Sequence, residues 1–211
     1  MKHINKSKEP DEFEKWKALA NEEWQPCYSN LDGKTKRHLK DSLMREQGYI
    51  CCYCERRLIE NDSHIEHLRP QSDYPDESLN YSNLLCSCLR DGRKGEPIHC
   101  GHSKGDWFDE TLLVSPLDPS CESRFAYGSD GTIGSADPHD KGVAETIARL
   151  GLNIPKLNEM RANAIAPFLD ATLSDSEFYD FVAGYLRTDP KSGYFGEFWT
   201  TIKWLFGAVC K

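Results

Sequence analysis

The sequence predicts an α+β fold that is mainly helical, and three observations favour it. Apolar residues recur at helical spacing toward both ends of the chain, as in Phe13, Trp16 and Leu19. Residues 112–133 have the composition of a small β-hairpin. Between these parts, residues 51–104 hold six of the nine cysteines and four of the seven histidines. The 211 residues therefore predict one domain, or one domain with a helical appendage, built around a metal-binding segment.

The first 48 residues are predicted to form two helices. Pro10 followed by two acidic residues is typical of a first helical turn, which places a helix at about 10–21. A second helix is expected at 33–47, with Gly48 as its cap. Its start carries a dense basic cluster, which is either a solvated face or a contact for phosphate. This cluster comprises Lys34, Lys36, Arg37, His38 and Lys40.

The remaining elements follow the cysteine-rich segment. Residues 89–98 have loop composition, and the hairpin at 112–133 comes next. We expect helices at 142–169, with Gly151 as a C-cap candidate inside that range, and then at 175–186 and 194–209. The last two are rich in aromatic residues, which more often fill a core than form a recognition surface.

Composition narrows the class of protein. The net charge is −8, which argues against a protein that coats nucleic acid by charge alone. Residues 1–104 carry 17 basic and 18 acidic residues, whereas residues 105–211 carry 9 and 16, so the acidity lies in the second half. That half is either an ordinary acidic surface or a docking face. No apolar run reaches the length of a membrane helix, no signal peptide is recognised, and clustered cysteines favour a reducing cytoplasm.

The cysteine spacing predicts a zinc site. Zinc in structural sites takes four tetrahedral ligands, and thiolates suit it. Cys51 and Cys54 are three residues apart, so one tight turn can present both sulfurs to one ion. The other two ligands must come from Cys86, Cys88 and Cys100, and spacing alone leaves that choice open.

The order of these residues resembles the HNH endonuclease motif, a ββα-metal nuclease finger with structural zinc. The motif runs from the Cys51–Cys54 pair through Glu66-His67 and Asn83 to the later cysteines and Lys104. Matching flanks make the chain similar to the PtuB family, the HNH nuclease subunits of Septu-type anti-phage systems that also occur beside some retrons. These flanks include Met1 to Ile4, Val114 to Leu117 and Thr146 to Asn153. The resemblance covers about residues 1–165. Together with the helical patterns at both ends, it predicts a helical segment at 1–48, a nuclease core at 49–133 and a helical region at 134–211.

The resemblance also assigns the zinc ligands. The motif places its cysteine five residues after Asn, and its last cysteine four residues before Lys. Cys88 follows Asn83 by five, and Cys100 precedes Lys104 by four. The implied zinc ligands are therefore Cys51, Cys54, Cys88 and Cys100, with Cys86 as the alternative to Cys88.

The catalytic roles come from the same resemblance. It implies that His67 is the general base and that Asn83 braces the loop that bears it. Glu66 stands where the family usually has Asp, and it is implied to ligate a catalytic Mg²⁺ or Mn²⁺. The family's second ligand, His or Asn, corresponds to Gly101 here, so His102 is favoured in its place and His99 is the alternative. Candidate nucleic-acid contacts are His64, Arg69, Lys104, Lys36 and Arg37.

The implied function is a metal-dependent endonuclease in an anti-phage complex with a PtuA-like ATPase, with DNA favoured as substrate. In retron-associated members the reverse transcriptase and its nucleic acid are further partners. Two alternatives stay open: a ribonuclease acting on tRNA, and a non-catalytic zinc-stabilised binding module. The chain is expected to dock through the helices after about residue 142, with Phe178, Tyr185, Phe198 and Trp199 as candidate contacts.

Overall fold

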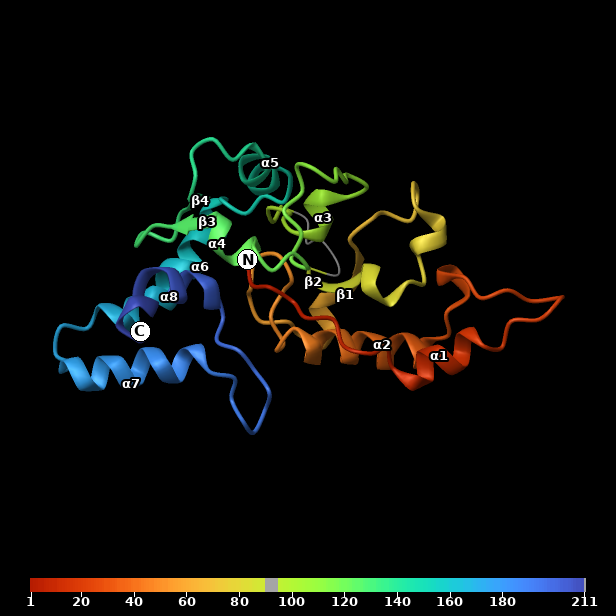
Figure 1. The fold of residues 1–211 in the computed structure, drawn as a ribbon, viewed down its shortest axis with the longest axis horizontal. Helices are drawn as coiled ribbons and strands as arrows, with labels where there is room; N and C mark the ends of the chain where they lie inside the picture. The colour runs from red at the N-terminus through yellow and green to blue at the C-terminus, as the bar shows by residue number, and fades with distance from the viewer. Residues whose placement is uncertain (90–94, 211) are drawn as a thin grey trace.

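The computed structural model describes residues 1–89 and 95–210. Part of the predicted loop at 89–98 therefore lies outside the described residues. Figure 1 shows a short central hairpin, β1–β2, with helix α2 on one side and α3 on the other. Helix α1 lies beside α2, and the C-terminal helices α7 and α8 lie at the opposite end of the molecule. The predicted α+β class is confirmed.

Both N-terminal helices form where the sequence predicts them. Helix α1 (Asp11–Lys17) is shorter than expected and buries Phe13 and Trp16. Helix α2 (Gly33–Glu46) is capped by Asp32, whose carboxylate accepts hydrogen bonds from the backbone amides of Lys34 and Thr35. Two residues after its end, Gly48 has a φ of 60°, which turns the chain toward the cysteine pair.

The central hairpin pairs β1 (Ser63–His67) with β2 (Leu84–Cys88) in antiparallel register. His67 lies opposite Leu84, and Ser63 lies opposite Cys88. The short helix α3 (Gly101–Lys104) follows, and its first amide donates to the Ser87 hydroxyl at 3.2 Å. The acid–His pair and the last cysteine therefore meet through strand pairing.

The predicted hairpin at 112–133 is wrong in its first half. Residues 112–120 form turns, and helix α4 (Cys121–Arg124) precedes strands β3 (Phe125–Tyr127) and β4 (Ile133–Ser135). The earlier apolar residues are buried for another reason: the Val114 amide donates to the Thr146 hydroxyl at 2.8 Å. That contact fixes the segment against α5 instead of in a sheet.

Four helices follow β4. The stretch predicted at 142–169 is divided into α5 (Lys141–Arg149) and α6 (Pro155–Ile165) at Gly151, whose φ is 60°, and a 3₁₀ turn ends it at Ala166–Leu169. Helix α7 (Asp175–Leu186) has the predicted limits, with a Ser174–Glu177 capping box. Helix α8 (Trp199–Phe206) begins later than predicted.

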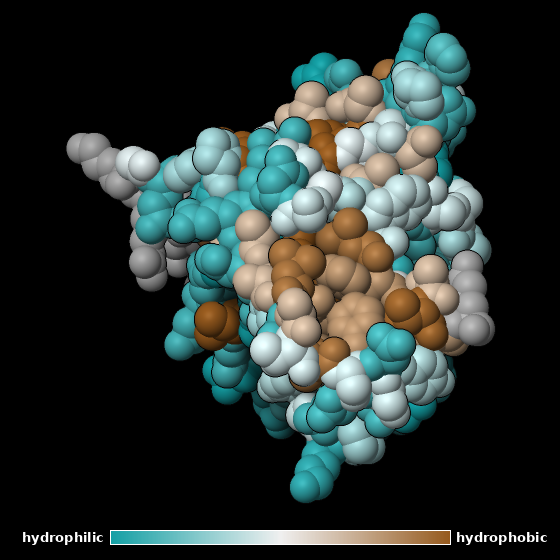
Figure 2. All heavy atoms as spheres, turned by 90° about the vertical axis from the view of Figure 1, so that its left-hand side faces the viewer, coloured by the Kyte–Doolittle hydropathy of each residue, from teal (hydrophilic) through white to brown (hydrophobic). Residues whose placement is uncertain are grey.

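Two hydrophobic clusters hold the described residues together. The larger runs from Met1 to Leu157 and includes Val143 and Leu150 of α5 and its C-cap, so residues of the predicted third region pack with the first two. The smaller comprises Ile165, Phe168, Val182 and Ile202. Figure 2 shows apolar residues gathered on the face at the C-terminal end. No helix among the described residues is long and apolar enough to cross a membrane.

Candidate metal centre and active site

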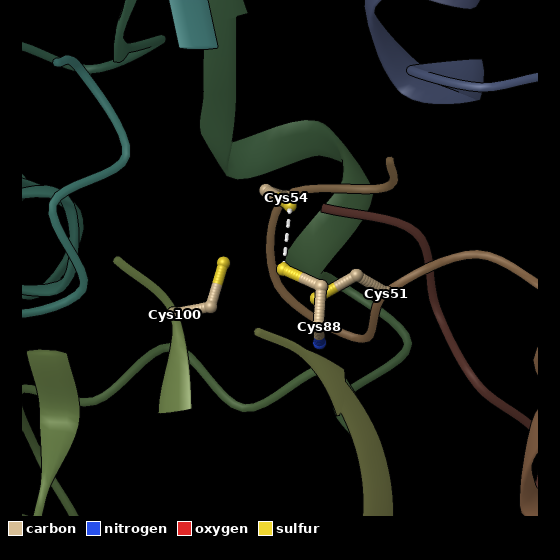
Figure 3. A group of neighbouring side chains, drawn as sticks. All are labelled: Cys51, Cys54, Cys88 and Cys100. Atoms are coloured by element: carbon tan, nitrogen blue, oxygen red, sulfur yellow. Dashed lines mark hydrogen bonds between the residues drawn. The ribbon is translucent and has the colours of Figure 1, made fainter. Parts of the chain in front are cut away.

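Four cysteines converge at one end of the central hairpin (Figure 3). Cys51 and Cys54 come from the turn after α2, Cys88 ends β2, and Cys100 precedes α3. Their four sulfur atoms all lie within 4.8 Å of one another, and those of Cys54 and Cys88 are 3.7 Å apart. Thiolates bound tetrahedrally to zinc at about 2.3 Å stand about 3.8 Å apart. The group can therefore hold a metal ion.

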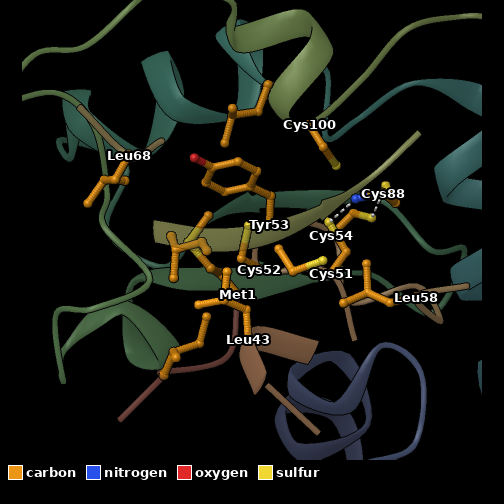
Figure 4. Packing of buried hydrophobic residues seen from close by; sticks show 14 of the residues in the cluster. Met1, Leu43, Cys51, Cys52, Tyr53, Cys54, Leu58, Leu68, Cys88 and Cys100 are labelled. Atoms are coloured by element: carbon orange, nitrogen blue, oxygen red, sulfur yellow. Dashed lines mark hydrogen bonds between the residues drawn. The ribbon is translucent and has the colours of Figure 1, made fainter. Parts of the chain in front are cut away.

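The surroundings of this group suit a closed structural site. Figure 4 shows the cysteine turn packed in the main core beside Leu43 and Leu58. The Cys88 amide donates to the Cys51 sulfur at 3.4 Å, and His99 Nδ1 lies 3.1 Å from the Cys100 sulfur. Burial raises the pKa of the Cys100 thiol. At Cys51 burial has the same tendency, but hydrogen bonds from neighbouring thiols outweigh it and lower the pKa.

The two residues that the sequence offered as alternative ligands, Cys86 and His99, are both buried. Cys86 is buried but is not a member of the four-cysteine group, and burial raises the pKa of its thiol to about 12. His99 is fully buried against the sulfur atoms of Cys88 and Cys100.

Glu66 is buried on β1 and is surrounded by polar partners. Its Oε1 lies 3.2 Å from the Lys104 ammonium and accepts a hydrogen bond from the Tyr53 hydroxyl at 3.1 Å. Its Oε2 lies 3.4 Å from His64 Nε2. Burial by itself raises the pKa of Glu66, but the hydrogen bond from His64 and the charge of Lys104 outweigh it, so the pKa falls below its usual value. The carboxylate is therefore ionised at neutral pH.

His67 has the surroundings of a general base. Its Nε2 lies 3.0 Å from the Ser78 carbonyl, which can only accept, so the ring proton is assigned to Nε2. Nδ1 then carries the lone pair and lies 3.3 Å from the Gln71 amide nitrogen. Burial lowers the pKa of His67, which keeps the ring neutral. A neutral imidazole with a fixed tautomer can accept a proton from water at Nδ1 once the water replaces the Gln71 amide there.

Asn83 fixes the backbone of the loop that follows His67 through side-chain hydrogen bonds. Its Oδ1 accepts from the Arg69 amide at 2.8 Å, and its Nδ2 donates to the carbonyls of Arg69 and Glu77 at 3.0 and 3.2 Å. The side chain is buried, so these three bonds satisfy it. Asn83 therefore fixes the backbone on both sides of the loop that carries Ser78.

The histidines around Glu66 come from both the strand and the helix. His102 on α3 is exposed, and its ring meets His64 edge-on with centroids 5.2 Å apart. His64 faces Glu66 because residues two apart on a strand share a face. The sequence predicts His64 only as a nucleic-acid contact, although its His-x-Glu spacing on a strand is the signal that places it beside Glu66.

The candidate nucleic-acid contacts divide into two groups. Lys104 is buried, and its ammonium also donates to the His67 carbonyl at 3.0 Å. Arg69 pairs with Glu77 and Glu110 at 3.4 and 3.1 Å. Lys36 and Arg37, by contrast, are exposed. They line a cleft of about 410 Å³ together with Tyr28, Lys40, Ser63 and His64.

Comparison with known proteins finds relatives of one kind. The chain is 34% identical over 137 residues to a Vibrio cholerae protein named as a candidate HNH endonuclease of retron Vc95, covering 62% of this chain and 64% of that protein. It is 30% identical over 210 residues to an Escherichia coli protein with the corresponding name for retron Ec83, covering 80% of each. It is 32% identical over 98 residues to the Septu protein PtuB of Bacillus thuringiensis, covering 45% of this chain and 37% of PtuB. No protein-family model matches the chain.

Proposed function

The chain belongs to the family of HNH endonucleases of retron and Septu PtuB type, and we propose that it is a metal-dependent nuclease that hydrolyses phosphodiester bonds. DNA is the proposed substrate. One observation carries the proposal: a neutral, oriented His67 lies next to an ionised, buried Glu66 on a strand joined to the four-cysteine group. A zinc module that only binds has no need of this pair. The strand–strand–helix order of β1, β2 and α3 is that of a ββα-metal finger.

We assign zinc to the four-cysteine group on the chemistry of its donors. Four buried sulfurs at tetrahedral separation suit zinc, whereas Mg²⁺ and Mn²⁺ prefer oxygen ligands. The ion would join the turn after α2, the end of β2 and the start of α3. Because these three segments also position Glu66 and Lys104, zinc binding would stabilise the arrangement of the proposed catalytic residues.

Glu66 is the proposed protein carboxylate for the catalytic Mg²⁺ or Mn²⁺. When bound, such an ion neutralises charge on the scissile phosphate and on the leaving oxygen. Lys104 occupies the Oε1 side of Glu66, which leaves Oε2 toward the imidazoles. The sequence predicts His102 as the second ligand, and the strand places His64 beside Glu66.

The remaining groups act on the water and on the chain itself. His67 Nδ1 takes the proton of the attacking water, and the Ser78 carbonyl stabilises the imidazolium that results. Asn83 keeps that carbonyl loop in place. Lys104 bridges Glu66 and the backbone carbonyl of His67, so it holds the carboxylate in place on β1.

The basic cleft is the proposed entry for the substrate backbone. Lys36 and Arg37 line it with His64, and the Lys36 ammonium lies 4.6 Å from the centre of the Tyr28 ring. That ring meets His67 edge-on at 4.5 Å, so the cleft leads to the base. Two exposed cations beside a polar cleft attract phosphate despite the net charge of the whole chain.

Partnership with a PtuA-like ATPase is proposed from the family alone. Two of the expected docking residues, Phe198 and Trp199, are buried in this chain and serve its own packing. The exposed aromatics of the last two helices are Tyr179, Phe181 and Trp204, and these replace them as candidates. Co-purification of a Trp204→Glu variant with the ATPase tests whether these exposed aromatics form the docking surface. Undiminished binding would exclude them.

His67→Ala tests the proposed chemistry. Removal of a general base lowers the cleavage rate by about 10²–10⁴-fold. The assay is cleavage of plasmid DNA and of tRNA by the zinc-loaded chain, with its ATPase, with and without Mg²⁺ or Mn²⁺. His139→Ala, an exposed histidine away from the site, is the matched control and should cut normally. A His67→Ala protein that cuts at the wild-type rate refutes the mechanism, and cleavage of tRNA alone refutes the substrate.

A further inference from the structure

The start of α3 lacks a side chain at the point where it approaches Glu66. Position 101 is glycine, and a Cβ built there would clash with Glu66 Oε2 and would lie 2.7 Å from His64 Nε2. Real Cβ atoms do not approach other atoms so closely. The space that a side chain of α3 would enter is therefore already filled by a carboxylate oxygen and an imidazole nitrogen from β1.

We propose that His64 is the imidazole ligand of the catalytic divalent ion, which it holds together with Glu66 Oε2. The inference rests on the proposed nuclease function. It differs from the sequence prediction of His102 in taking both protein ligands from one strand. Gly101 has a matching role, because a Cβ at this position would displace the Glu66 carboxylate and the His64 ring from their present places.

The separation of the two donor atoms fits a shared ion. His64 Nε2 and Glu66 Oε2 are 3.4 Å apart. Adjacent ligands of an octahedral ion with bonds of about 2.1 Å are about 3 Å apart. A small rotation of either side chain closes the difference.

The two donor atoms are held facing one another. His64 Nε2 is directed at the Glu66 carboxylate, whereas the other ring nitrogen, Nδ1, is buried away from it. Glu66 is held in place by Tyr53 and Lys104 through its other oxygen, so Oε2 stays directed at His64.

His64 also borders the basic cleft. It lines that cleft with Lys36 and Arg37, so an ion on His64 and Glu66 would meet a phosphate that enters there. His102 is exposed on the far side of the His64 ring, with centroids 5.2 Å apart. In this arrangement His102 contacts His64, and its loss leaves the pair of ligands intact.

Pulsed electron paramagnetic resonance of Mn²⁺ tests the assignment without any cleavage assay. The zinc-loaded full chain should show one directly coordinated imidazole nitrogen. His64→Ala should lose that coupling and bind Mn²⁺ at least about tenfold more weakly. His102→Ala, the matched comparison, should keep the coupling. Zinc content and melting temperature, measured on every variant, report whether the finger is intact.

The outcomes separate this inference from the nuclease proposal. Loss of the nitrogen coupling in His102→Ala, or its retention in His64→Ala, overturns the role of His64, whereas only the His67→Ala cleavage assay bears on the nuclease mechanism. If His64→Ala fails to retain zinc, His64→Asn carries the test, because it keeps a polar side chain beside Glu66 and still removes the imidazole. Persistence of the coupling in His64→Asn overturns the inference.

Discussion

Replacing Cys88 by serine tests the zinc site at its most informative ligand. Cys88 and Cys86 lie two residues apart on β2, and their exposed fractions are 1% and 0%. Both substitutions exchange a buried thiol for a hydroxyl of similar shape. Only Cys88 belongs to the four-sulfur group, so Cys86→Ser is a matched control for burial without ligation.

The size of the effect follows from the number of ligands. Structural zinc contributes about 10–16 kcal/mol in small finger peptides, so one of four thiolates accounts for about 2.5–4 kcal/mol. In a chain of this length that loss lowers the melting temperature by about 10 °C. Burying a hydroxyl in place of the Cys86 thiol costs about 1–3 kcal/mol. Because the two losses in stability overlap, stability alone does not distinguish the variants.

Zinc content does distinguish them. After dialysis against a competing chelator of intermediate strength, we expect about one zinc per chain in the wild type and in Cys86→Ser, and almost none in Cys88→Ser, whose zinc affinity is lower by the share of one ligand. A strong chelator should lower the melting temperature of the first two proteins and leave Cys88→Ser unchanged. Full zinc in Cys88→Ser, with loss in Cys86→Ser, would refute the geometric argument.

Three further predictions concern the brace, the cleft and a helix cap. Asn83→Asp should reduce cleavage at least about tenfold with zinc retained, because a carboxylate cannot donate to the two loop carbonyls; normal cleavage would contradict the bracing role. Lys36→Ala combined with Arg37→Ala should weaken DNA binding and reduce the slope of log affinity against log salt concentration by about two, with Mn²⁺ binding unchanged. An unaltered slope would exclude the cleft as the site of phosphate contact. Asp140→Asn keeps a cap on α5 but loses the ion pair with Arg124 at 2.8 Å, at a cost of about 1 kcal/mol. The hydrogen bond from Arg124 lowers the pKa of Asp140 below its ordinary value of 3.8. Urea unfolding should therefore show this difference near pH 7 and lose it as the pH falls below that ordinary value and through the lowered pKa, and a constant difference would contradict the assignment.

Much of the local structure was predictable because its causes lie close together in the chain. The Ser174–Glu177 capping box and the apolar spacing that follows it set the limits of α7. The Cys51–Cys54 spacing likewise predicts a turn that presents two sulfurs to one ion. The hairpin at 112–133 was mispredicted because Val114 is buried by a contact with Thr146, a residue 32 positions away.

The chemistry of the centre was thus readable in residue types, whereas the partners of each side chain depended on long-range pairing. The resemblance to the HNH motif implied an acid–His pair, a bracing Asn and four thiolates. The register of β1 on β2 and the approach of α3 then decided that Glu66 faces His64 and that Lys104 is buried against both Glu66 and the His67 carbonyl. Strand alternation fixes only which side chains share a face. Which atoms meet across that face depends on packing between segments up to 40 residues apart, and no local pattern encodes that packing.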